Sequence, residues 1–256
     1  PLITKKVSLE NFQQIYGDIS NSKSIASIIE YTPSNNLKKT ISIENKLFNG
    51  KKGVIGIVGS GNFTSSTILP CLRKCKAKIK YIASSGGLSS TILAKKYRIA
   101  NSTTDYNEIF NDNDIDLVFI TTQHNTHAKL TIEAISSGKN VFVEKPLALD
   151  NAQLEKIINI YKSNNVNLTV GFNRRFSPMA KKMKTLLSSS KTPINIVATM
   201  NAGFIPKNSW VHDMELGGGR IIGEACHFID LCTFLTSSKI ISVCMNSMGK
   251  NFQENT

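Results

Sequence analysis

The sequence predicts an α/β protein with a parallel sheet, followed by the first part of an α+β domain whose sheet is open. Over residues 51–172, short apolar runs rich in β-branched residues alternate with helical patterns. From residue 173 onward this rhythm changes, and runs of alternating apolar and polar residues appear. Buried β-branched strands separated by helices are typical of right-handed βαβ units, which build parallel sheets.

The elements of the parallel sheet follow one another along the chain. The predicted strands are residues 53–58, 78–83, 116–122, 140–145 and 167–172. The predicted helices are residues 63–75, 89–97, 105–110 and 127–138, and a fifth that Asp150 caps. Gly138 is expected to end the fourth helix, because glycine adopts the left-handed conformation of a C-terminal cap. The apolar face of the fifth helix carries Leu154, Ile157, Ile158 and Tyr161.

Residues 173–256 are predicted to open a second domain for substrate binding and oligomerisation. Its predicted elements are helix 178–187, strand 194–202, helix 221–235 and strand 240–248. Two long strands and few helices leave a sheet face uncovered and an edge unpaired. We therefore expect this domain to be truncated.

Residues 1–50 belong to neither of these units. Residues 1–32 contain an amphipathic helix (8–19) and a short strand (26–31). Residues 33–50 are predicted to be a linker, because Pro33, Asn35 and Asn36 interrupt any regular pattern. The chain starts with Pro1 rather than Met, which suggests a fragment or a processed chain.

Composition argues against several classes of protein. The net charge is +13, but the basic residues are mostly scattered Lys, without the Arg-rich, aromatic-interleaved stripe of a nucleic-acid-binding surface. Apolar runs are shorter than a membrane span, so no membrane partner is expected. The 5 Cys form no CxxC pair, and the 4 His lack Cys or carboxylate partners at metal-ligand spacing. We expect reduced, mostly buried thiols, no metal and a cytoplasmic location.

A glycine-rich turn follows the first strand of the sheet. The stretch GIVGSGNFT places Gly59 and Gly61 between a strand and a helix, as a dinucleotide-binding turn requires. Gly59 allows the tight turn, and Gly61 lets the backbone approach a pyrophosphate at the helix N-terminus. Asn62 and Phe63 follow in the same turn and join the predicted cofactor site. A plain strand–helix turn is the alternative interpretation.

The end of the second strand bears on the choice of nicotinamide cofactor. NAD-binding sites carry an Asp or Glu there for the ribose 2′-hydroxyl. This chain has ASSGGLSS instead, with Ser84 and Ser85 in that position and Lys95 and Lys96 downstream. Hydroxyl and ammonium groups tolerate a 2′-phosphate, so the sequence favours NADP weakly over NAD. A solvated helix face is the alternative interpretation of the two lysines.

Two polar stretches follow the next strands at the carboxyl edge, where open parallel sheets bind ligands. FITTQHNTH brings Thr122, His124 and His127 to this edge, and VFVEKP brings Glu144 and Lys145. We assign these five residues to the cofactor site. Lys145 at the rim can also fix a substrate hydroxyl and help to ionise it. An ordinary ion pair between Glu144 and Lys145 is the alternative.

The stretch GGGRIIGEACHFIDL supplies a candidate base. Its three glycines permit close approach of a ligand, and helical spacing places Glu224, His227 and Asp230 along one face. An imidazole beside carboxylates can hold a proton near neutral pH. We therefore assign His227 and Glu224 to catalysis. A satisfied core histidine is the alternative for His227.

These motifs together resemble the Gfo/Idh/MocA oxidoreductase family over about residues 51–248, in the order glycine turn, TTQHNTH, GKNVFVEKPLAL and GGG…H.ID. The resemblance implies a Rossmann domain, a second domain on a large open sheet through which subunits associate, and NAD(P)-dependent hydride transfer at a sugar, cyclitol or related carbinol. It also implies that Lys145 is the catalytic lysine and His227 the proton acceptor.

The chain departs from the family pattern at several positions. The family's Asp, four residues before its His, falls on Gly223, with Glu224 next to it. The TPNxxH element appears as Thr122, Gln123 and His124, followed by His127. The family's second domain is also longer than residues 173–256.

The first residues carry a second resemblance. PLITKKVSLENFQQIYGDI, followed by ASIIEY, resembles the tail of a medium-chain, zinc-type alcohol dehydrogenase. This resemblance implies a fusion of two oxidoreductases, with the zinc ligands of the first lying upstream of Pro1.

Two functions compete at this point. The first is an oxidoreductase in which a sugar-like substrate lies between Lys145 and His227, with Arg174 and Trp210 as further substrate-binding residues. The second is a dinucleotide-binding module without catalysis, because the family's Asp and part of its second domain are missing. Cofactor binding without turnover would favour the second.

Overall fold

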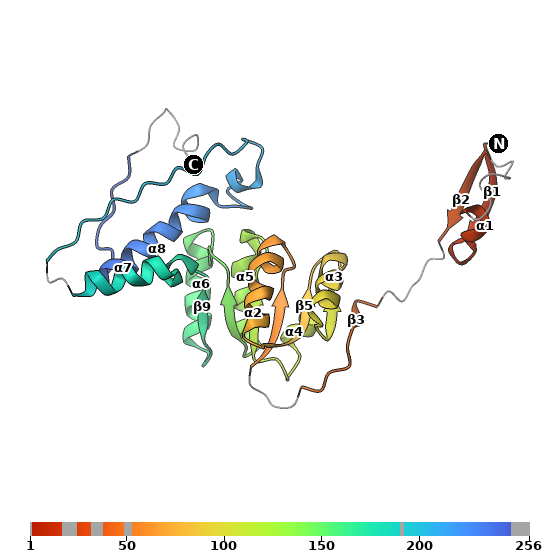
Figure 1. Ribbon diagram of the computed structural model, residues 1–256, viewed down its shortest axis with the longest axis horizontal. Helices are drawn as coiled ribbons and strands as arrows, with labels where there is room; N and C mark the ends of the chain where they lie inside the picture. The colour runs from red at the N-terminus through yellow and green to blue at the C-terminus, as the bar shows by residue number, and fades with distance from the viewer. Residues whose placement is uncertain (1, 17–24, 32–37, 49–52, 190–191, 247–256) are drawn as a thin grey trace. The chain divides into compact units, whose positions relative to one another are not determined.

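The computed structural model describes residues 2–16, 25–31, 38–48, 53–189 and 192–246. The chain divides into two compact units, Pro1–Lys39 and Thr40–Thr256 (Figure 1). The predicted linker residues Pro33, Asn35 and Asn36 lie outside the described residues. No helix in the described part is long and apolar enough to cross a membrane.

The first unit is built on a two-stranded parallel sheet. β1 (Ile3–Ser8) pairs with β2 (Ala26–Glu30), and η1 (Leu9–Asn11) and α1 (Gln13–Tyr16) follow β1. The predicted helix and short strand are therefore present, and residues 17–19 of that helix lie outside the described part. Among the described residues of this unit, only the apolar side chain of Val7 is buried. Such a small sheet is marginally stable by itself.

The second unit contains a seven-stranded sheet in the order β3-β6-β5-β4-β7-β8-β9. Its strands are β3 (Thr40–Ser42), β4 (Val54–Val58), β5 (Lys78–Ala83), β6 (Asn101–Thr103), β7 (Leu117–Ile120), β8 (Asn140–Val143) and β9 (Leu168–Val170). All pairs are parallel except β3–β6, which is antiparallel. The predicted parallel α/β sheet is therefore confirmed. From β4, the strands β5 and β6 follow on one side, and β7, β8 and β9 follow on the other. Open parallel sheets bind ligands where the order of the strands changes direction in this way.

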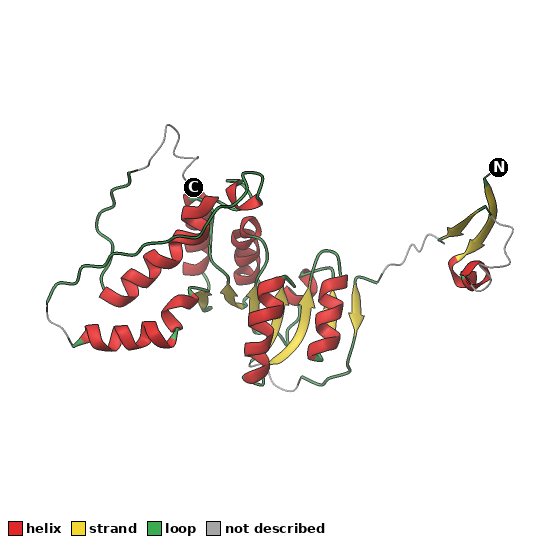
Figure 2. Ribbon diagram, turned by 45° about the horizontal axis from the view of Figure 1, so that its top comes forward, coloured by secondary structure: helices red, strands yellow, loops and turns green. Residues whose placement is uncertain are grey.

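Helices cover both faces of this sheet (Figure 2). They are η2 (Thr64–Ile68), which continues as α2 (Leu69–Lys74), α3 (Leu88–Tyr97), α4 (Asn107–Phe110), α5 (His124–Ser136) and α6 (Asn151–Lys162). Successive side chains of a strand point to opposite faces. Ile55 and Ile57 of β4 therefore join the core that contains Leu69 of α2. Val54 and Val58 join the other core, with residues of α4 and α5.

Both predicted helix caps are present. Asp150 accepts a 2.8 Å hydrogen bond from the backbone N–H of Gln153 at the start of α6. Gly138 has a φ of 71° just after α5, and its N–H donates to the carbonyl of Ile135. These contacts satisfy backbone groups that a helix end leaves unpaired. They explain why the sequence signals located both ends correctly.

The sequence pattern misses two of the three shortest strands of the sheet, β3 and β6. β3 lies inside the predicted linker 33–50, so that prediction is wrong for residues 40–42. β3 and β6 have three residues each and contain no apolar run. Pairing between the strands stabilises them instead, together with a 2.8 Å hydrogen bond from Thr40 Oγ1 to Thr103 Oγ1.

After the sheet, the described chain forms helices and no further strand. The helices are η3 (Asn173–Phe176), α7 (Pro178–Ser188), η4 (Trp210–His212), η5 (Ile221–Ala225) and α8 (Cys226–Thr236). The predicted helices 178–187 and 221–235 are confirmed. The predicted strands 194–202 and 240–248 are wrong over their described residues, and residues 247–248 lie outside the description. An alternating sequence forms a strand only where its backbone pairs, and Val197 and Ile241 are 88% and 95% exposed.

All five cysteines are free thiols. The prediction that they are mostly buried is wrong, because Cys71, Cys75 and Cys244 are exposed and the other two are half-buried. Cys71 lies two residues beyond the fully buried Leu69 in α2. Two residues turn a helix by about 200°, which directs this thiol away from the core.

Candidate functional site

The glycine turn after β4 is shaped by one residue that cannot carry a side chain. Gly59 has a φ of 113°, and a Cβ there would lie 2.7 Å from the backbone carbonyl of Thr121. Its N–H donates to the carbonyl of Ala83 at 3.0 Å, which holds the turn against β5. Gly61 is different, because a Cβ at that position would meet no atom within 4 Å. The turn is therefore tight at Gly59 and open at Gly61.

A cavity of about 880 Å³ lies at the carboxyl ends of β4, β5 and β7. Six of the residues predicted to bind the cofactor line it: Gly59, Gly61, Asn62, Phe63, Ser84 and Thr122. Other lining residues, which no sequence motif predicts, follow β6 or lie on α3 and α5: Ser89, Thr104, Tyr106, Thr126 and Lys129. The reversal of strand order identifies this edge once the sheet is known, but no local motif marks those residues.

Hydroxyl groups occupy the place where an acidic residue would bind an adenosine ribose. Ser84 Oγ lies 2.9 Å from Ser90 Oγ and 3.3 Å from Ser89 Oγ, and Ser60 Oγ lies 2.5 Å from Ser89 Oγ. No carboxylate lines the cavity in the part of the chain that the structure describes. Among the described residues that line the cavity, Lys129 alone is charged. The cavity wall therefore carries no negative charge next to Ser84.

A second cavity of about 450 Å³ brings together four of the predicted catalytic and substrate-binding residues: Lys145, Arg174, Glu224 and His227. Lys145 follows β8, and its Nζ donates a 2.5 Å hydrogen bond to the carbonyl oxygen of Gly223 in η5. This bond joins the edge of the sheet to the helix that carries His227. Among the described ion pairs none joins Glu144 to Lys145, so the alternative of a strand-end pair is not observed.

His227 lies in this cavity as a neutral imidazole. Burial, followed by the charges of Lys145 and Arg174, lowers its pKa from 6.5 to about 4. Its Nδ1 is buried without a hydrogen-bond partner among the described residues. The expectation that nearby carboxylates hold a proton on His227 near neutral pH is therefore wrong. A neutral ring with a free nitrogen can instead accept a proton.

The two carboxylates near His227 are engaged by arginines. Glu224 Oε2 lies 3.1 Å from Arg220 Nη2, one helical turn earlier. Asp230 Oδ2 accepts a 2.9 Å hydrogen bond from Arg175 Nε, and the second carboxylate oxygen bonds Arg175 Nη2. Both acids are thus neutralised locally, so after burial the positive charges of Lys145 and Arg174 lower the pKa of His227 more than Asp230 raises it.

Glu144 and Gly171 form a close contact beside Lys145. A Cβ at Gly171 would lie 2.7 Å from Glu144 Oε1, so a side chain there would displace the Glu144 carboxyl group. Burial raises the pKa of the Glu144 carboxyl to about 7, and the charge of Lys145 opposes this rise. Near neutral pH, Glu144 is therefore divided between its protonated and ionised forms.

The histidines of the TTQHNTH stretch link the two cavities. His127 is buried, with Nδ1 2.7 Å from the carbonyl of Pro146 and Nε2 3.1 Å from that of Thr122. It thereby ties the residue after Lys145 to the end of β7. His124 Nδ1 lies 2.9 Å from the carbonyl of Gly217. Burial lowers the pKa of both histidines.

Four predicted cofactor residues and one predicted substrate residue lie outside the cavity to which each was assigned. His124, His127, Glu144 and Lys145 do not line the larger cavity, and Trp210 does not line the smaller one. Trp210 packs edge-on against the ring of His124, with 5.0 Å between centroids. Among the described residues, no cluster of His, Cys, Asp or Glu could hold a metal ion.

Comparison with known proteins relates part of this chain to one family of oxidoreductases. Residues 54–172 match the family described as "Oxidoreductase family, NAD-binding Rossmann fold", GFO_IDH_MocA. The uncharacterized oxidoreductase YrbE of Bacillus subtilis is 29% identical over 195 residues, which cover 75% of this chain and 56% of that protein. Myo-inositol 2-dehydrogenase of Thermotoga maritima is 27% identical over 153 residues, covering 59% of this chain and 45% of that protein.

A solved structure of levoglucosan dehydrogenase, in complex with NADH and levoglucosan, shares the fold. Its TM-score is 0.59 at 24% identity, covering 72% of this chain and 54% of that one. The chain thus spans about half the length of the known proteins that it matches. Residues 54–172 are thus similar to the Gfo/Idh/MocA oxidoreductases, and the fold that they form is of the Rossmann type.

Proposed function

We propose that this chain provides the cofactor site and catalytic pair of an NAD(P)-dependent oxidoreductase acting on a hydroxyl or carbonyl carbon of a sugar or cyclitol. The observation that carries this proposal is that Lys145 and His227 line the same cavity. The hydrogen bond from Lys145 to the carbonyl of Gly223, four residues before His227, joins the two segments that carry them. The names of two similar proteins, a myo-inositol dehydrogenase and a levoglucosan dehydrogenase, support the substrate class.

The larger cavity fits a nicotinamide dinucleotide. Gly59 has no room for a side chain, and the open position at Gly61 stands at the start of the η2 helix, where backbone N–H groups favour a pyrophosphate. Ser84 and its neighbouring hydroxyls would meet the adenosine ribose. Because no carboxylate lines the described wall, a 2′-phosphate is tolerated, and we propose NADP as the preferred cofactor over NAD. When bound, the nicotinamide supplies the hydride acceptor or donor.

Each catalytic side chain has a separate role in this proposal. Lys145 donates a hydrogen bond to the substrate oxygen and stabilises negative charge on it. His227, which is neutral, accepts the hydroxyl proton in oxidation and returns it in reduction. The carbonyl of Gly223 orients the ammonium group, at the position where the family pattern has an Asp. Arg174 lies in the same cavity and would bind further substrate hydroxyls, whereas Glu224 is held by Arg220.

Substitution of Lys145 by Met tests the proposal directly. We expect Lys145→Met to lower kcat by about 10²–10⁴-fold while NADPH affinity stays within about twofold. NADPH and NADH binding are measured by fluorescence titration, and turnover is screened over sugars and cyclitols. Lys156→Met, at an exposed position on α6, is the matched control. Unchanged turnover in Lys145→Met would contradict the proposed role.

A dinucleotide-binding module without catalysis is the second candidate. It is favoured by the two carboxylates near His227, which arginines already engage, and by the exposed segment 194–202. Saturable NADPH binding with no turnover of any substrate in the screen would support this module. We also propose that the chain associates with copies of itself and that residues 1–32 are related to medium-chain dehydrogenases.

A further inference from the structure

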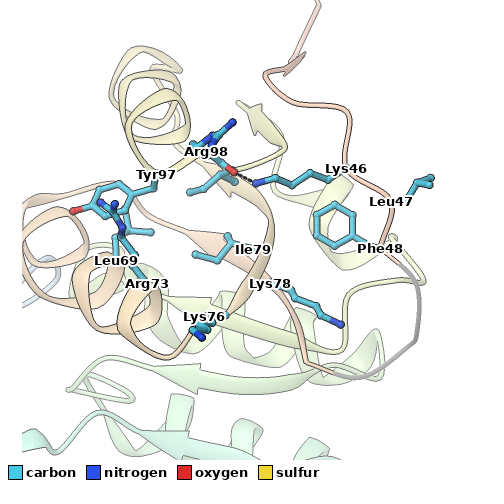
Figure 3. Close-up of a pocket in the computed structure, with 12 residues that line it drawn as sticks. Lys46, Leu47, Phe48, Leu69, Arg73, Lys76, Lys78, Ile79, Tyr97 and Arg98 are labelled. Atoms are coloured by element: carbon cyan, nitrogen blue, oxygen red, sulfur yellow. Dashed lines mark hydrogen bonds between the residues drawn. The ribbon is translucent and has the colours of Figure 1, made fainter.

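A third cavity, of about 420 Å³, lies at the end of the sheet opposite to the cofactor cavity (Figure 3). Lys78 and Ile79, the first residues of β5, line it, whereas Ala83 at the other end of β5 lines the cofactor cavity. Its other walls come from residues 46–48, from α2 with the turn after it, and from residues 97–99. Nothing in the proposed oxidoreductase function uses this cavity.

The lining of this cavity is strongly basic. Five cationic residues line it, and no acidic residue does so in the described chain: Lys46, Arg73, Lys76, Lys78 and Arg98. Glu44 lies nearby and pairs with Lys46 at 3.0 Å and with Arg98 at 2.6 Å. None of the ion pairs found among the described residues includes the other three cations. Like charges around a concave surface create a positive potential that attracts anions.

Local secondary structure explains two of the three unpaired cations. Arg73 lies in the last turn of α2, where the helix dipole favours a positive charge. Lys76 closes the same helix, since its N–H donates to the carbonyl of Arg73, and a positive charge is favoured there too. Lys78 begins a strand, so it gains nothing from a helix end.

Two of the five cations that line the cavity have an uncommon backbone conformation. Lys76 and Arg98 have φ values of 53° and 56°, in the left-handed region that favours glycine or asparagine. In the described chain, Ser237 is the only other non-glycine residue with positive φ. Two of these three strained positions therefore carry long cations that line one cavity. All three positions close a helix, where the left-handed conformation is common and glycine is the usual residue.

The floor of the cavity is apolar. Leu69 and Ile99 are buried beneath it, and Ile79 is half-buried. Figure 3 shows the rings of Tyr97 and Phe48 on opposite sides, with Ile79 between them. The Tyr97 hydroxyl lies 3.3 Å from the carbonyl of Ser65, which anchors that ring. A ligand that fits this lining needs both an anionic group and a flat apolar group.

We propose that this cavity binds a small organic phosphate ester. Its phosphate lies among Arg73, Lys76 and Lys78, and its flat apolar group lies over Ile79, between Tyr97 and Phe48. One carboxylate, with a charge of −1, cannot neutralise three unpaired cations. A phosphate monoester carries about −1.5 to −2 charge at neutral pH and neutralises more of their charge. The guanidinium of Arg73 also presents the forked donors that match phosphate oxygens. The volume is within the range of small-molecule sites.

Phenyl phosphate is the probe that tests this site. Calorimetric titration of the whole chain, with NADPH occupying the cofactor cavity, is expected to show saturable binding at one site. The double variant Arg73→Glu/Lys78→Glu should weaken that binding by at least about tenfold. Lys156→Glu/Lys162→Glu, on exposed positions of α6, makes the same change in net charge and should shift the Kd by less than about twofold. Absence of saturable binding, or equal losses in both double variants, would overturn the proposal.

Lys76→Gly separates binding from folding. Glycine relieves the left-handed backbone, so the melting temperature should rise by about 2–4 °C while phenyl phosphate affinity falls. Ser237→Gly gives the matched relief outside the cavity and should leave the affinity unchanged. A stabilised Lys76→Gly that binds as tightly as the parent chain would contradict the assigned phosphate position.

Two further ligands test the chemical class. Inorganic phosphate and benzoate should each bind more weakly than phenyl phosphate, because each lacks one of the two groups. Equal affinity for inorganic phosphate would remove the role of the apolar floor, and equal affinity for benzoate would remove the preference for phosphate. Repeating the titration without NADPH keeps this test independent of the proposed oxidoreductase function.

Discussion

The sheet over residues 54–172 and the segment over residues 173–246 contribute the two halves of the candidate active site, but they are built differently. The sheet has apolar cores on both faces, and Lys145 lies two residues after β8, which pairs with β7 and β9. The later segment leaves large apolar side chains such as Val197 and Ile241 exposed. A few polar bonds link it to the sheet, among them Lys145–Gly223 and His124–Gly217.

This difference teaches that the two catalytic groups are positioned by different physical means. Packing fixes Lys145, because β8 is surrounded by other strands and helices. The place of His227 depends on specific hydrogen bonds, including the bond between Arg175 and Asp230. Substitutions in the sheet should therefore change global stability, whereas substitutions in the later segment should change the site with smaller effects on the fold.

The largest expected effect comes from the glycine turn in the sheet. Gly59→Ala should destabilise the fold by about 2–4 kcal/mol, because it forces a side chain against Thr121 at a φ of 113°. NADPH binding should be lost with it. Urea unfolding followed by circular dichroism and NADPH titration provide the measurements.

Gly61→Ala is the matched control for that change. Its Cβ would meet no atom within 4 Å, so the free energy of unfolding should change by less than about 1 kcal/mol. NADPH binding should still weaken, since the added methyl group lies where the pyrophosphate is proposed to approach. Equal stability losses in both variants would show that the turn is not shaped as described.

A second prediction contrasts one apolar residue from each region. Ile57 is fully buried, so Ile57→Ala should lower the free energy of unfolding by about 2–5 kcal/mol. Val197 is exposed, so Val197→Ala should lower it by less than about 0.5 kcal/mol. Both values come from urea unfolding. A cost above about 1 kcal/mol at Val197 would indicate that this segment is packed in solution.

The smallest expected effects concern pH and have opposite signs in the two regions. The pKa of Glu144 is raised from 4.5 to about 7, so the folded state binds its proton more tightly and stability falls as pH rises through that window. The pKa of His227 is lowered from 6.5 to about 4, so stability falls as pH drops through that window. Glu144→Gln should remove the first loss, and His227→Asn the second. Urea unfolding between about pH 4 and 8 measures both.

The two variants control for one another in this experiment. The two windows overlap between about pH 4.5 and 6.5, where the two contributions oppose one another in the parent chain. In this range stability should rise with pH in Glu144→Gln and fall with pH in His227→Asn. The same change of slope in both variants would mean that neither group titrates independently in the folded state, which would contradict the assigned pKa directions.

Much of the sheet is predictable from sequence because its longer strands carry β-branched, apolar runs. β3 and β6 are not predictable, because three residues without an apolar run give no such signal and the strands depend on pairing. Strands 194–202 and 240–248 show the converse error. Their alternating sequence indicates strand propensity, but the described structure gives these segments no partner to pair with.

The candidate site shows a similar division. Gly59, Lys145 and His227 stand in motifs whose residue types follow from local geometry, so sequence alone located them. The acceptor for Lys145 is a backbone carbonyl, and carbonyls carry no sequence signal. The ion pair between Arg220 and Glu224 is predictable from sequence, because the two residues are four apart on a helix, which is the spacing of an ion pair.

Trp210 is the single tryptophan of the chain, and its indole rests against His124. Tryptophan fluorescence therefore comes from η4, which carries Trp210, and needs no added label. Reduced nicotinamide absorbs where indole emits, so resonance energy transfer from Trp210 would report the dinucleotide as it arrives. Protonation of the adjacent imidazole would quench the same emission, which makes one optical signal sensitive to both events.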